Sequence, residues 1–518
     1  MATSGLAGPE ITEGLLISYE DIRDLFKAND LGVIIFDPPT RGLPVDILNK
    51  VTDSEPLLRR SHNIYPELYP NVFLTSDIHA DLEKFMFILY NMGIIDTYYT
   101  THPDNSSSPF FASTLDKLMN AITNFNVIFS PGSKFLLVII GDLVDGKRGP
   151  GNEINDMFGN LEVLLHIFLY NLRIKARLQG SEVLFTIGNH DWHTVINPDF
   201  SPLYTDYIHR TAKQYFGDNG YYKGRIAFTN RRNTLLPFYR LSPYVVITIG
   251  RELICVHGGL HNTLGDMTDD IIALQTEIDT NGLETLLEIT RTSFLSNVNS
   301  PLWTRFYAKE SEASVCGSIG DRFFLTAVGH CPTDAYSGLP GYMSQLEAVD
   351  TARCGSSGCL LFGCKTDNAP KLAFVDITMS RAFRPGLSDN TRFNEILVLK
   401  HDPSPTFQGE RYYNIIINAR NLLNGNFQLV WQQQEFANEP FNVLPTPNDL
   451  PPGPPAVRPE EPYTTTGASA PQLQNPYNQN TNYPRWAEWE LGQLGGKRKK
   501  TRRHKKRASR SRKVLRRK

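Results

Sequence analysis

Short apolar runs alternate with longer amphipathic segments between residues 71 and 190. The runs VFLTSD, FLLVIIGD and EVLFTIGN have the length and the apolar character of buried strands. The segments DLEKFMFILYNMG and NLEVLLHIFLYNLRIKARL stand between them and have the length and periodicity of helices. Strands that alternate with helices of about 10–20 residues are typical of an α/β fold, which we therefore expect here.

From about residue 235 the pattern changes to closely spaced strands. The expected strands are YVVITIG, ELICVHG, FLTAVGH, CLLFGC, LAFVDI, EILVLKH, RYYNIIIN and FQLVW. KTDNAPK separates CLLFGC from LAFVDI and is typical of a turn, so these two strands should form a hairpin. From residue 438 the chain is rich in Pro, Asn, Gln and Thr, a composition that cannot bury a core. We expect an N-terminal extension packed on the body (1–70), a main domain (71–437), a flexible linker (438–496) and a basic tail (497–518).

The formal net charge of −2 conceals a strong asymmetry. The tail holds 15 of the 52 Lys and Arg residues and no acid, so the rest of the chain has 37 basic residues against 54 acidic ones. A disordered tail with this positive charge is expected to bind nucleic acid or another polyanion. The binding should be non-specific, because no aromatic residues lie between the charges. Nuclear import, contact with anionic lipid, and association with a virion if the protein is viral stay open as alternatives.

Composition and cysteine usage favour a globular intracellular protein. Hydrophobic residues make up 41% of the chain, yet no apolar run reaches the length of a membrane-spanning helix, so no transmembrane segment is expected. The first residues lack the basic start and apolar core of a secretory signal. Six cysteines are few for 518 residues. We expect reduced thiols and a cytoplasmic or nuclear location.

Five of the apolar runs end on side chains that can bind metal ions. The run ends are SDIHAD, GDLVDG, GNHD, VHGG and VGHC, with the candidates Asp77, His79, Asp142, Asp145, Asn189, His190, His257 and His330. Taken singly, each is better explained as a turn, cap or core residue. Five in succession are hard to obtain by chance, and open α/β sheets bind ligands at the carboxyl ends of their strands. Imidazoles with Asp and Asn oxygens suit Mn²⁺, Fe or Zn²⁺.

In this order the motifs D-x-H, G-D-x-V-D-G, G-N-H-D, H-G-G and G-H resemble those of the calcineurin-like metallophosphoesterase superfamily. H-G-G and the valine of the second motif are closer to its Ser/Thr protein phosphatase branch. PLWTRFY (301–307), VGHCPT and FVDITMS (374–380) are similar to segments of Shewanella-like phosphatases. The resemblance covers roughly residues 71–385. It implies a four-layer αββα sandwich, two divalent metal ions and a phosphorylated substrate, either a protein or a small phosphoester.

The resemblance also implies a role for each motif residue. One metal ion would be held by Asp77, His79 and Asp142, and the other by Asp142, Asn189, His257 and His330. His190 would be the general acid that protonates the leaving group after attack by a metal-activated water or hydroxide, and Asp145 would orient it. His193 and His261 lie close to these motifs but outside the expected ligand set, so we expect them at the surface or behind the ligands.

One departure from the family pattern concerns the substrate. Classical protein phosphatases have D-R-G where this chain has Asp145-Gly146-Lys147, so the usual phosphate-binding arginine is missing. Arg148, or Lys147 beside it, is one candidate to replace it, and Arg305 in PLWTRFY is a second candidate. A phosphomonoesterase of the protein phosphatase type is the first hypothesis. Dinucleotide polyphosphate hydrolase, cyclic nucleotide phosphodiesterase, nuclease and a non-catalytic virion-associated scaffold stay open, because the motifs build a metal core and not a substrate pocket.

Overall fold

A computed structural model describes most of residues 11–376, together with 397–402, 412–413, 416–418 and 430–432. Within 11–376 the undescribed stretches are 29–33, 37–41, 102–105, 130–132, 145–159, 198–231, 289–293, 331–359 and 364–369, besides gaps of one or two residues. The linker and the basic tail expected from the sequence lie outside the described residues. All the described residues belong to one unit of the chain.

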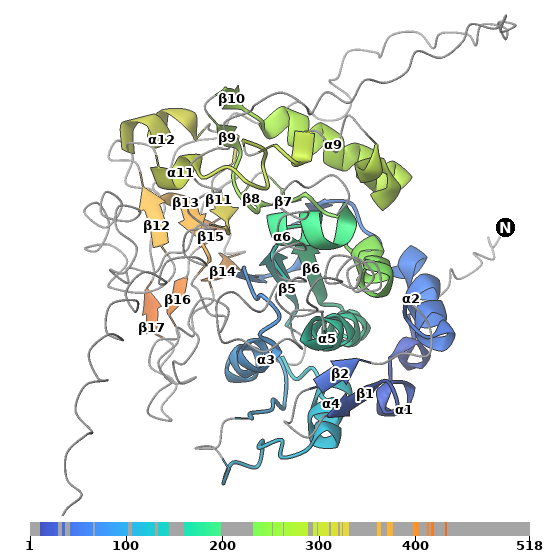
Figure 1. Cartoon of the computed structure of the whole chain (residues 1–518). Coiled ribbons are helices and arrows are strands. Elements are labelled where there is room, and N and C mark those ends of the chain that lie inside the picture. Colours follow the sequence, from blue (N-terminus) through green and yellow to red (C-terminus); the bar gives the residue numbers. More distant parts are fainter. Residues whose placement is uncertain are drawn as a thin grey trace, which may run out of the picture. The chain divides into compact units, whose positions relative to one another are not determined.

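Two β-sheets form the centre of this unit (Figure 1). The five-stranded sheet has the order β15 (Tyr412–Tyr413), β14 (Leu397–Asp402), β4 (Asn71–Thr75), β5 (Phe135–Ile140) and β6 (Glu182–Thr186). The six-stranded sheet has the order β12 (Leu360–Gly363), β13 (Pro370–Phe374), β11 (Leu325–Val328), β8 (Leu253–Val256), β7 (Val246–Ile249) and β3 (Asn63–Ile64). Shorter two-stranded pairs are β1 (Phe26–Ala28) with β2 (Ile34–Phe36), β9 (His261–Asn262) with β10 (Gly265–Asp266), and β16 (Ile416–Asn418) with β17 (Val430–Gln432).

Helices connect and cover these strands. They are α1 (Tyr19–Ile22), α2 (Val45–Leu58), α3 (Leu82–Asn91), α4 (Leu115–Thr123), α5 (Asn160–Leu178), α6 (Asn189–Asp191), α9 (Thr268–Asn281), α11 (Phe306–Lys309) and α12 (Glu312–Ser318), with a further helix over 232–241. Figure 1 shows α3, α4 and α5 on one side of the paired sheets and α9 on the other. The layers are therefore helix, sheet, sheet and helix, which confirms the predicted fold class. No described helix is both long and apolar enough to span a bilayer.

The first sheet follows from the alternating pattern in the sequence. β4, β5 and β6 are parallel, and every one of their residues is buried, as expected for strands that are covered on both faces. Their register aligns Thr75 with Ile139 and Ile140 with Thr186. The residues that follow the three strands therefore lie at one edge of the sheet.

The second sheet brings two further strand ends to the same region. β8 and β11 are parallel, and Val256 pairs with Val328, so the residues after them are neighbours. β12 and β13 form the antiparallel hairpin that the sequence predicts. A bridge between Thr186 and Tyr244, with the Ile187 N–H donating to the Tyr244 carbonyl at 2.7 Å, links the end of β6 to the chain just before β7.

Two pairings join distant parts of the chain. β14 runs antiparallel to β4 and extends the first sheet. β3, which lies in the segment expected to be an N-terminal extension, is the edge strand next to β7. Nearer the N-terminus, the Asn171 side chain of α5 accepts from the Ile17 N–H and donates to the Ile17 carbonyl at 2.9 and 2.8 Å. Ile17 is fully buried, so this part of the N-terminal segment packs on the body.

Candidate metal centre

Three motif loops follow the parallel strands of the first sheet and are hydrogen-bonded to one another. The N–H groups of Asp77 and His79, after β4, donate to the carbonyls of Gly141 and Asp142, after β5, at 3.1 and 2.9 Å. The His190 N–H, after β6, donates to the carboxylate of Asp142 at 2.9 Å. The loops therefore continue the strand pairing beyond the strands and bring their side chains together.

The second sheet supplies two imidazoles that face these loops. His257 follows β8 and His330 follows β11, and the Gly329 N–H donates to the His257 carbonyl at 2.9 Å. The His330 N–H donates to the carboxylate of Asp77 at 3.0 Å, which joins the two sheets at the site. The residues predicted to bind metal ions thus converge from five separate strand ends.

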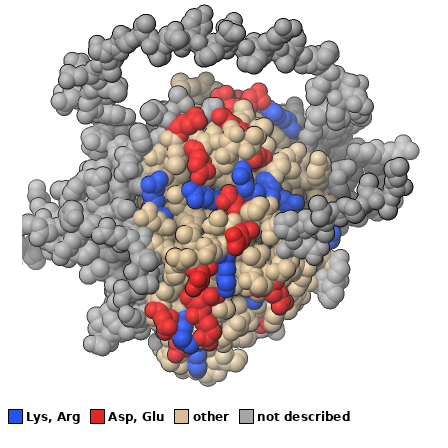
Figure 2. Space-filling model, turned by 90° about the vertical axis from the view of Figure 1, so that its right-hand side faces the viewer, with Lys and Arg blue, Asp and Glu red and all other residues tan. Residues whose placement is uncertain are grey.

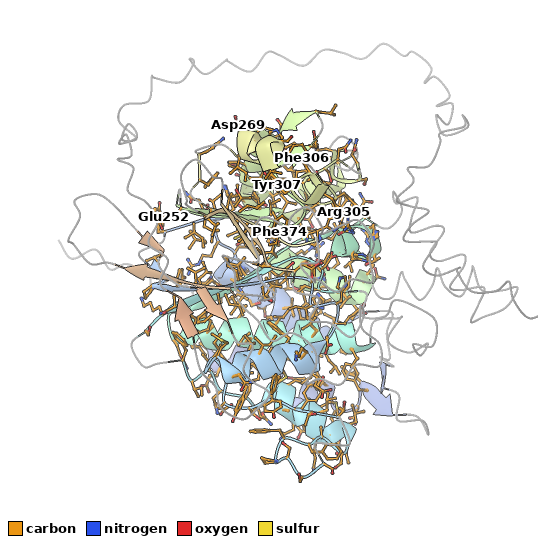
Figure 3. All side chains as sticks on the ribbon, turned by 90° about the vertical axis from the view of Figure 1, so that its left-hand side faces the viewer. Glu252, Asp269, Arg305, Phe306, Tyr307 and Phe374 are labelled. Carbon is orange, nitrogen blue, oxygen red and sulfur yellow. The ribbon has the colours of Figure 1, made fainter. Side chains whose placement is uncertain are left out.

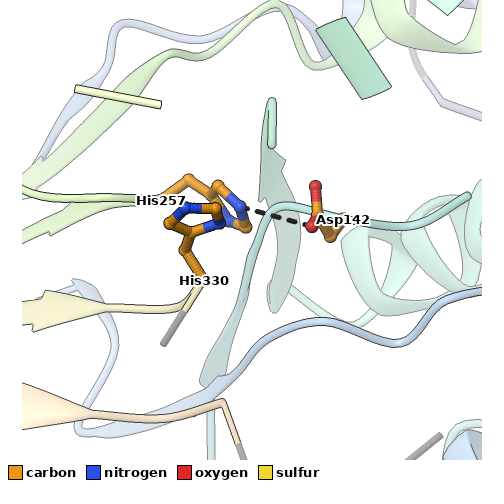
Figure 4. Close-up of side chains that lie close together, drawn as sticks. All are labelled: Asp142, His257 and His330. Atoms are coloured by element: carbon orange, nitrogen blue, oxygen red, sulfur yellow. Dashed lines mark ion pairs between the residues drawn. The ribbon is translucent and has the colours of Figure 1, made fainter. Parts of the chain in front are cut away.

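Two groups of buried donors in this cluster could each hold a metal ion. One group is Asp77, His79 and Asp142, and the other is Asp142, His257 and His330, with the donor atoms of each group within 4.8 Å of one another. Figure 4 shows the second group, in which His257 Nε2 lies 3.4 Å from Asp142 Oδ2. The same nitrogen is 2.8 Å from Asn189 Oδ1. Asp142 is common to both groups, as a bridging ligand would be.

The backbone at the site adopts a conformation that side chains rarely tolerate. The described non-glycine residues with positive φ are Asp77 (52°), His79 (44°), Ala80 (57°), Asp142 (53°) and His330 (61°). Such left-handed conformations cost on the order of 1–3 kcal/mol each and persist only where the surroundings enforce them. Four of the five residues carry candidate ligands, so the strain lies where side chains must turn sharply out of strands toward one point.

Two glycines make the close approach of these loops possible. A Cβ atom at Gly188 would overlap the carboxylate of Asp142. A Cβ atom at Gly141, whose φ is +76°, would lie 2.6 Å from His257 Nδ1. The glycines that flank the motif residues in the sequence are therefore required by packing at the site.

Hydrogen bonds to backbone carbonyls orient two of the imidazoles. The Nδ1–H groups of His79 and His257 donate to the carbonyls of Val144 and Ile140 at 2.8 and 2.9 Å. A carbonyl can only accept, so each Nδ1 carries the hydrogen and Nε2 is left for a cation. His330 Nε2 is buried and has no hydrogen-bond partner among the described residues. These nitrogen and oxygen donors fit divalent transition-metal ions.

The charges in the cluster shift one another's pKa values. Burial would raise the pKa of Asp142, but the nearby histidines, with His257 first, outweigh burial and hold that pKa well below its usual range. Burial would lower the pKa of His257, but the Asp142 carboxylate raises it to about 10. The pKa of His330 is well below its usual value because of burial and the positive charge of Arg305. In the absence of metal, His257 is therefore the cation that pairs with Asp142.

Asp191 holds two of the motif loops together, a role that we did not predict for it from the sequence. It is fully buried, and one carboxylate oxygen accepts from the N–H groups of Leu143 and Val144 at 3.0 and 3.3 Å. The same oxygen accepts from the Tyr239 hydroxyl at 2.8 Å, and the other oxygen accepts from the Gly188 N–H at 2.9 Å. Burial and the Asp142 charge raise the pKa of Asp191 to about 6. Its position in the G-N-H-D motif was the only sequence signal for this contact.

His190 and His193 lie side by side at the site. The His190 ring is partly exposed and makes an edge-to-face contact with the His79 ring, with centroids 5.2 Å apart. The His193 ring lies 5.1 Å from that of His190 and is only 8% exposed. We expected His193 either at the surface or behind the ligands, and the structure buries it against the candidate acid. His261, also expected at the surface or behind the ligands, is half-buried, and its ring contacts that of Phe306 at a tilt of 51°.

The segment 301–307 forms a further wall of the site. The Pro301 carbonyl accepts from the N–H groups of Gly258 and Gly259 at 2.7 and 3.1 Å, which fixes the segment against the loop after His257. Figure 3 shows Arg305 beside Phe306 and Tyr307 in this segment. Arg305 is close enough to lower the pKa of His330 by its charge. Asp145 and Arg148, predicted as the orienting acid and a phosphate-binding residue, lie outside the described residues.

Two buried donor groups that share one aspartate are the arrangement expected of a two-metal enzyme, a class that includes phosphatases, nucleases and polymerases. Residues 70–345, just over half of the chain, match the family model described as Calcineurin-like phosphoesterase. The chain belongs to the calcineurin-like phosphoesterase family. This match confirms the family resemblance and identifies the protein as a metal-dependent phosphoester hydrolase.

Among solved structures, the chain is similar to a cold-active protein-tyrosine phosphatase from a psychrophilic Shewanella species. The two share 17% identity over 69% of this chain and 81% of that chain, with a TM-score of 0.36. A protein serine/threonine phosphatase from Saccharomyces cerevisiae is 13% identical over 70% of this chain and 92% of that chain, with a TM-score of 0.30. No curated protein matches the sequence. The family assignment rests on the match over residues 70–345.

Proposed function

We propose that the protein is a phosphomonoesterase of the Ser/Thr protein phosphatase type, acting on phosphorylated proteins or small phosphoesters. The observation that supports this proposal is the pair of donor groups that share Asp142, with the positive charge of Arg305 beside the second group. A phosphomonoester carries two negative charges at neutral pH, one more than a diester. An arginine that approaches the donor groups favours the more highly charged substrate.

The six proposed ligands would bind two divalent cations. Asp77, His79 and Asp142 would hold one, and Asp142, Asn189, His257 and His330 the other. When bound, such ions neutralise phosphate charge and lower the pKa of water. The protein keeps these donor atoms buried and directed toward the site. The left-handed backbone conformations and the hydrogen bonds of His79 and His257 to backbone carbonyls hold them there.

His190 is our candidate for the general acid. All six proposed ligands are buried, whereas His190 is partly exposed, so we expect its ring to reach a substrate held by those ligands. Its backbone is fixed by the bond from its N–H to Asp142. The ring can then give a proton to the leaving oxygen of the phosphoester. Asp145 stays the predicted orienting acid, and Arg305 and Arg148 stay the predicted phosphate-binding residues.

A substrate panel tests the proposal against its rivals within the family. With Mn²⁺ present, p-nitrophenyl phosphate and phosphopeptides should be hydrolysed faster than bis-p-nitrophenyl phosphate or diadenosine tetraphosphate. Faster turnover of bis-p-nitrophenyl phosphate would favour a phosphodiesterase or nuclease, and faster turnover of diadenosine tetraphosphate would favour a dinucleotide polyphosphate hydrolase. Absence of turnover with several metals, together with less than about one bound metal ion per chain, would favour the non-catalytic scaffold.

Two substitutions separate the acid from the ligands. His190→Asn should keep the metal content near normal and lower kcat about 10²–10⁴-fold, the usual contribution of general acid catalysis. The loss should be smaller for substrates with good leaving groups, because these need less protonation. Asp142→Asn should lose both metal and activity. Loss of metal in His190→Asn would show that the two roles are wrongly assigned.

We also infer that the basic tail, residues 497–518, binds a polyanion such as nucleic acid. This inference rests on composition, since the tail holds 15 Lys and Arg and no acid. Figure 2 shows that the described part of one face of the body carries both acidic and basic side chains. The protein truncated at Gly496 should no longer bind to immobilised DNA or RNA at low salt. Its turnover of a small phosphoester should change by less than about twofold. Retention that survives truncation would contradict the inference.

A further inference from the structure

Two aromatic residues outside the proposed ligand set connect the candidate acid to the second metal group. The His193 ring lies between those of His190 and Trp303, with centroids 5.1 Å from each and interplanar angles of 78° and 88°. The Trp303 ring is 6.2 Å from that of His330, at 82°. These are favourable edge-to-face geometries for aromatic rings. The rings therefore form a continuous packed row from His79 through His190 to His330.

The backbone around His193 is held in an unusual local conformation. Residues Trp192–Ile196 form a single π-helical turn, closed by a bond from the Asn197 N–H to the Trp192 carbonyl at 2.8 Å. Such turns occur frequently at functional sites. The Trp192 indole donates to the Ser296 hydroxyl at 3.0 Å and fixes the turn from outside. Within this turn the His193 ring packs against that of His190, three residues earlier.

Trp303 provides a rigid support behind His193. Trp303 is 8% exposed, and its backbone N–H donates to the Ser300 carbonyl at 3.0 Å. The next residue, Thr304, donates from its hydroxyl to the His261 carbonyl at 2.8 Å. Hydrogen bonds from Trp303 and Thr304 thus hold this segment in place. His190, which contacts His193 in turn, is partly exposed.

We propose that His193, supported by Trp303, is a positioning residue for His190, and this inference rests on the proposed function. The His190 ring packs against the rings of both His79 and His193, and these two contacts limit its rotation. A general acid acts only within hydrogen-bond reach of the leaving oxygen. An imidazole free to rotate away from that oxygen would donate its proton less often, although it would remain chemically intact.

Comparison of His193→Ala with His193→Phe tests the proposal. The phenyl ring keeps an aromatic edge against His190, whereas alanine leaves space beside it. With an alkyl phosphate, whose leaving group is poor, His193→Ala should lower kcat about 10–100-fold, since a small misplacement of a catalytic group has effects of this size. With p-nitrophenyl phosphate the loss should stay within about threefold. KM and metal content should not change, and His193→Phe should recover most of the activity.

Parallel measurement of His190→Asn separates this inference from the proposed function. If His190→Asn shows no dependence on the leaving group, the acid role itself fails. If His190→Asn shows that dependence and His193→Ala does not, only the positioning role is wrong. Loss of metal in His193→Ala, or equal losses in His193→Phe and His193→Ala, would also overturn it. If His193→Ala does not fold, His193→Leu, which fills the space without a ring edge, should show the same dependence on the leaving group.

Discussion

Binding of a divalent metal ion should release a proton from His257. Although burial favours the neutral imidazole, the Asp142 carboxylate raises the pKa of His257 to about 10 in the metal-free protein. A cation and a proton cannot occupy the same nitrogen, so metal binding near neutral pH must expel the proton. His330 should release none, because burial and the charge of Arg305 keep its pKa well below the usual value and the ring neutral.

The size of the effect follows from the shifted pKa. A pH of 7.5 is about 2.5 units below the His257 pKa of about 10. Each pH unit corresponds to ~1.36 kcal/mol, so removal of the proton makes the free energy of metal binding less favourable by about 3.4 kcal/mol. The apparent affinity should therefore rise about tenfold for each pH unit between about 7 and 9. In the metal-free protein the same raised pKa means that the charged His257 stabilises the fold fully below about pH 6.5. That stabilisation is lost as the pH rises toward 10.

Calorimetric titration of metal-stripped protein with Mn²⁺ measures the released proton. The observed heat should change with the ionisation enthalpy of the buffer, with a slope that corresponds to about one proton for the site that contains His257. His257→Asn should abolish the proton release. The matched variant His330→Asn should weaken metal binding but should still release about one proton. A release near zero in the unaltered protein, or an undiminished release in His257→Asn, would refute the reasoning.

Three further changes test other parts of the structure. Gly188→Ala should lower metal content and p-nitrophenyl phosphate turnover more than about tenfold, because the methyl group would overlap the Asp142 carboxylate and overpacking forces such neighbours to move. The control Gly317→Ala, whose methyl group meets no neighbour, should preserve both. Asp191→Asn should lower the free energy of unfolding by about 1–3 kcal/mol, because an amide nitrogen cannot accept the bonds that the buried carboxylate accepts; an unchanged urea midpoint would contradict this. Asp279→Asn should reduce the loss of stability between pH 7 and pH 3 in urea unfolding. Burial opposes the charged form of Asp279, but its histidine partner holds the pKa below the usual value, so the carboxylate stabilises the fold above about pH 4 and ceases to do so as the pH falls below its own pKa.

The strands and the meeting of their ends could be predicted from the sequence for a local reason. β4, β5 and β6 are continuous apolar runs separated by helix-length segments, and such units pair in parallel with their carboxyl ends together. That rule alone places Asp77, Asp142 and Asn189 at one edge. The hairpin of β12 and β13 could also be predicted from local sequence, because a short turn sequence joins its strands.

Other features depended on contacts that no local pattern encodes. β14 pairs with β4 because the first sheet has an open edge there, and a strand sequence does not state which edge it will occupy. His193 is buried within a π-helical turn, a conformation that a helix period of 3.6 residues does not predict. The role of Asp191 depends on backbone N–H groups from another loop, which no side-chain motif records. The predictions for Asp145 and Arg148 stay untested, because both lie outside the described residues.

The family match ends at residue 345, but the two sheets do not. β13 covers one side of β11, and β14 covers one side of β4, and both covering strands come later in the chain. A fragment that stopped at residue 345 would contain every proposed ligand, yet it would leave unpaired N–H and C=O groups along two central strands. Open strand edges of this kind pair with other molecules. Such a fragment should therefore associate with itself, and a well-behaved minimal enzyme must extend at least through β14, to Asp402.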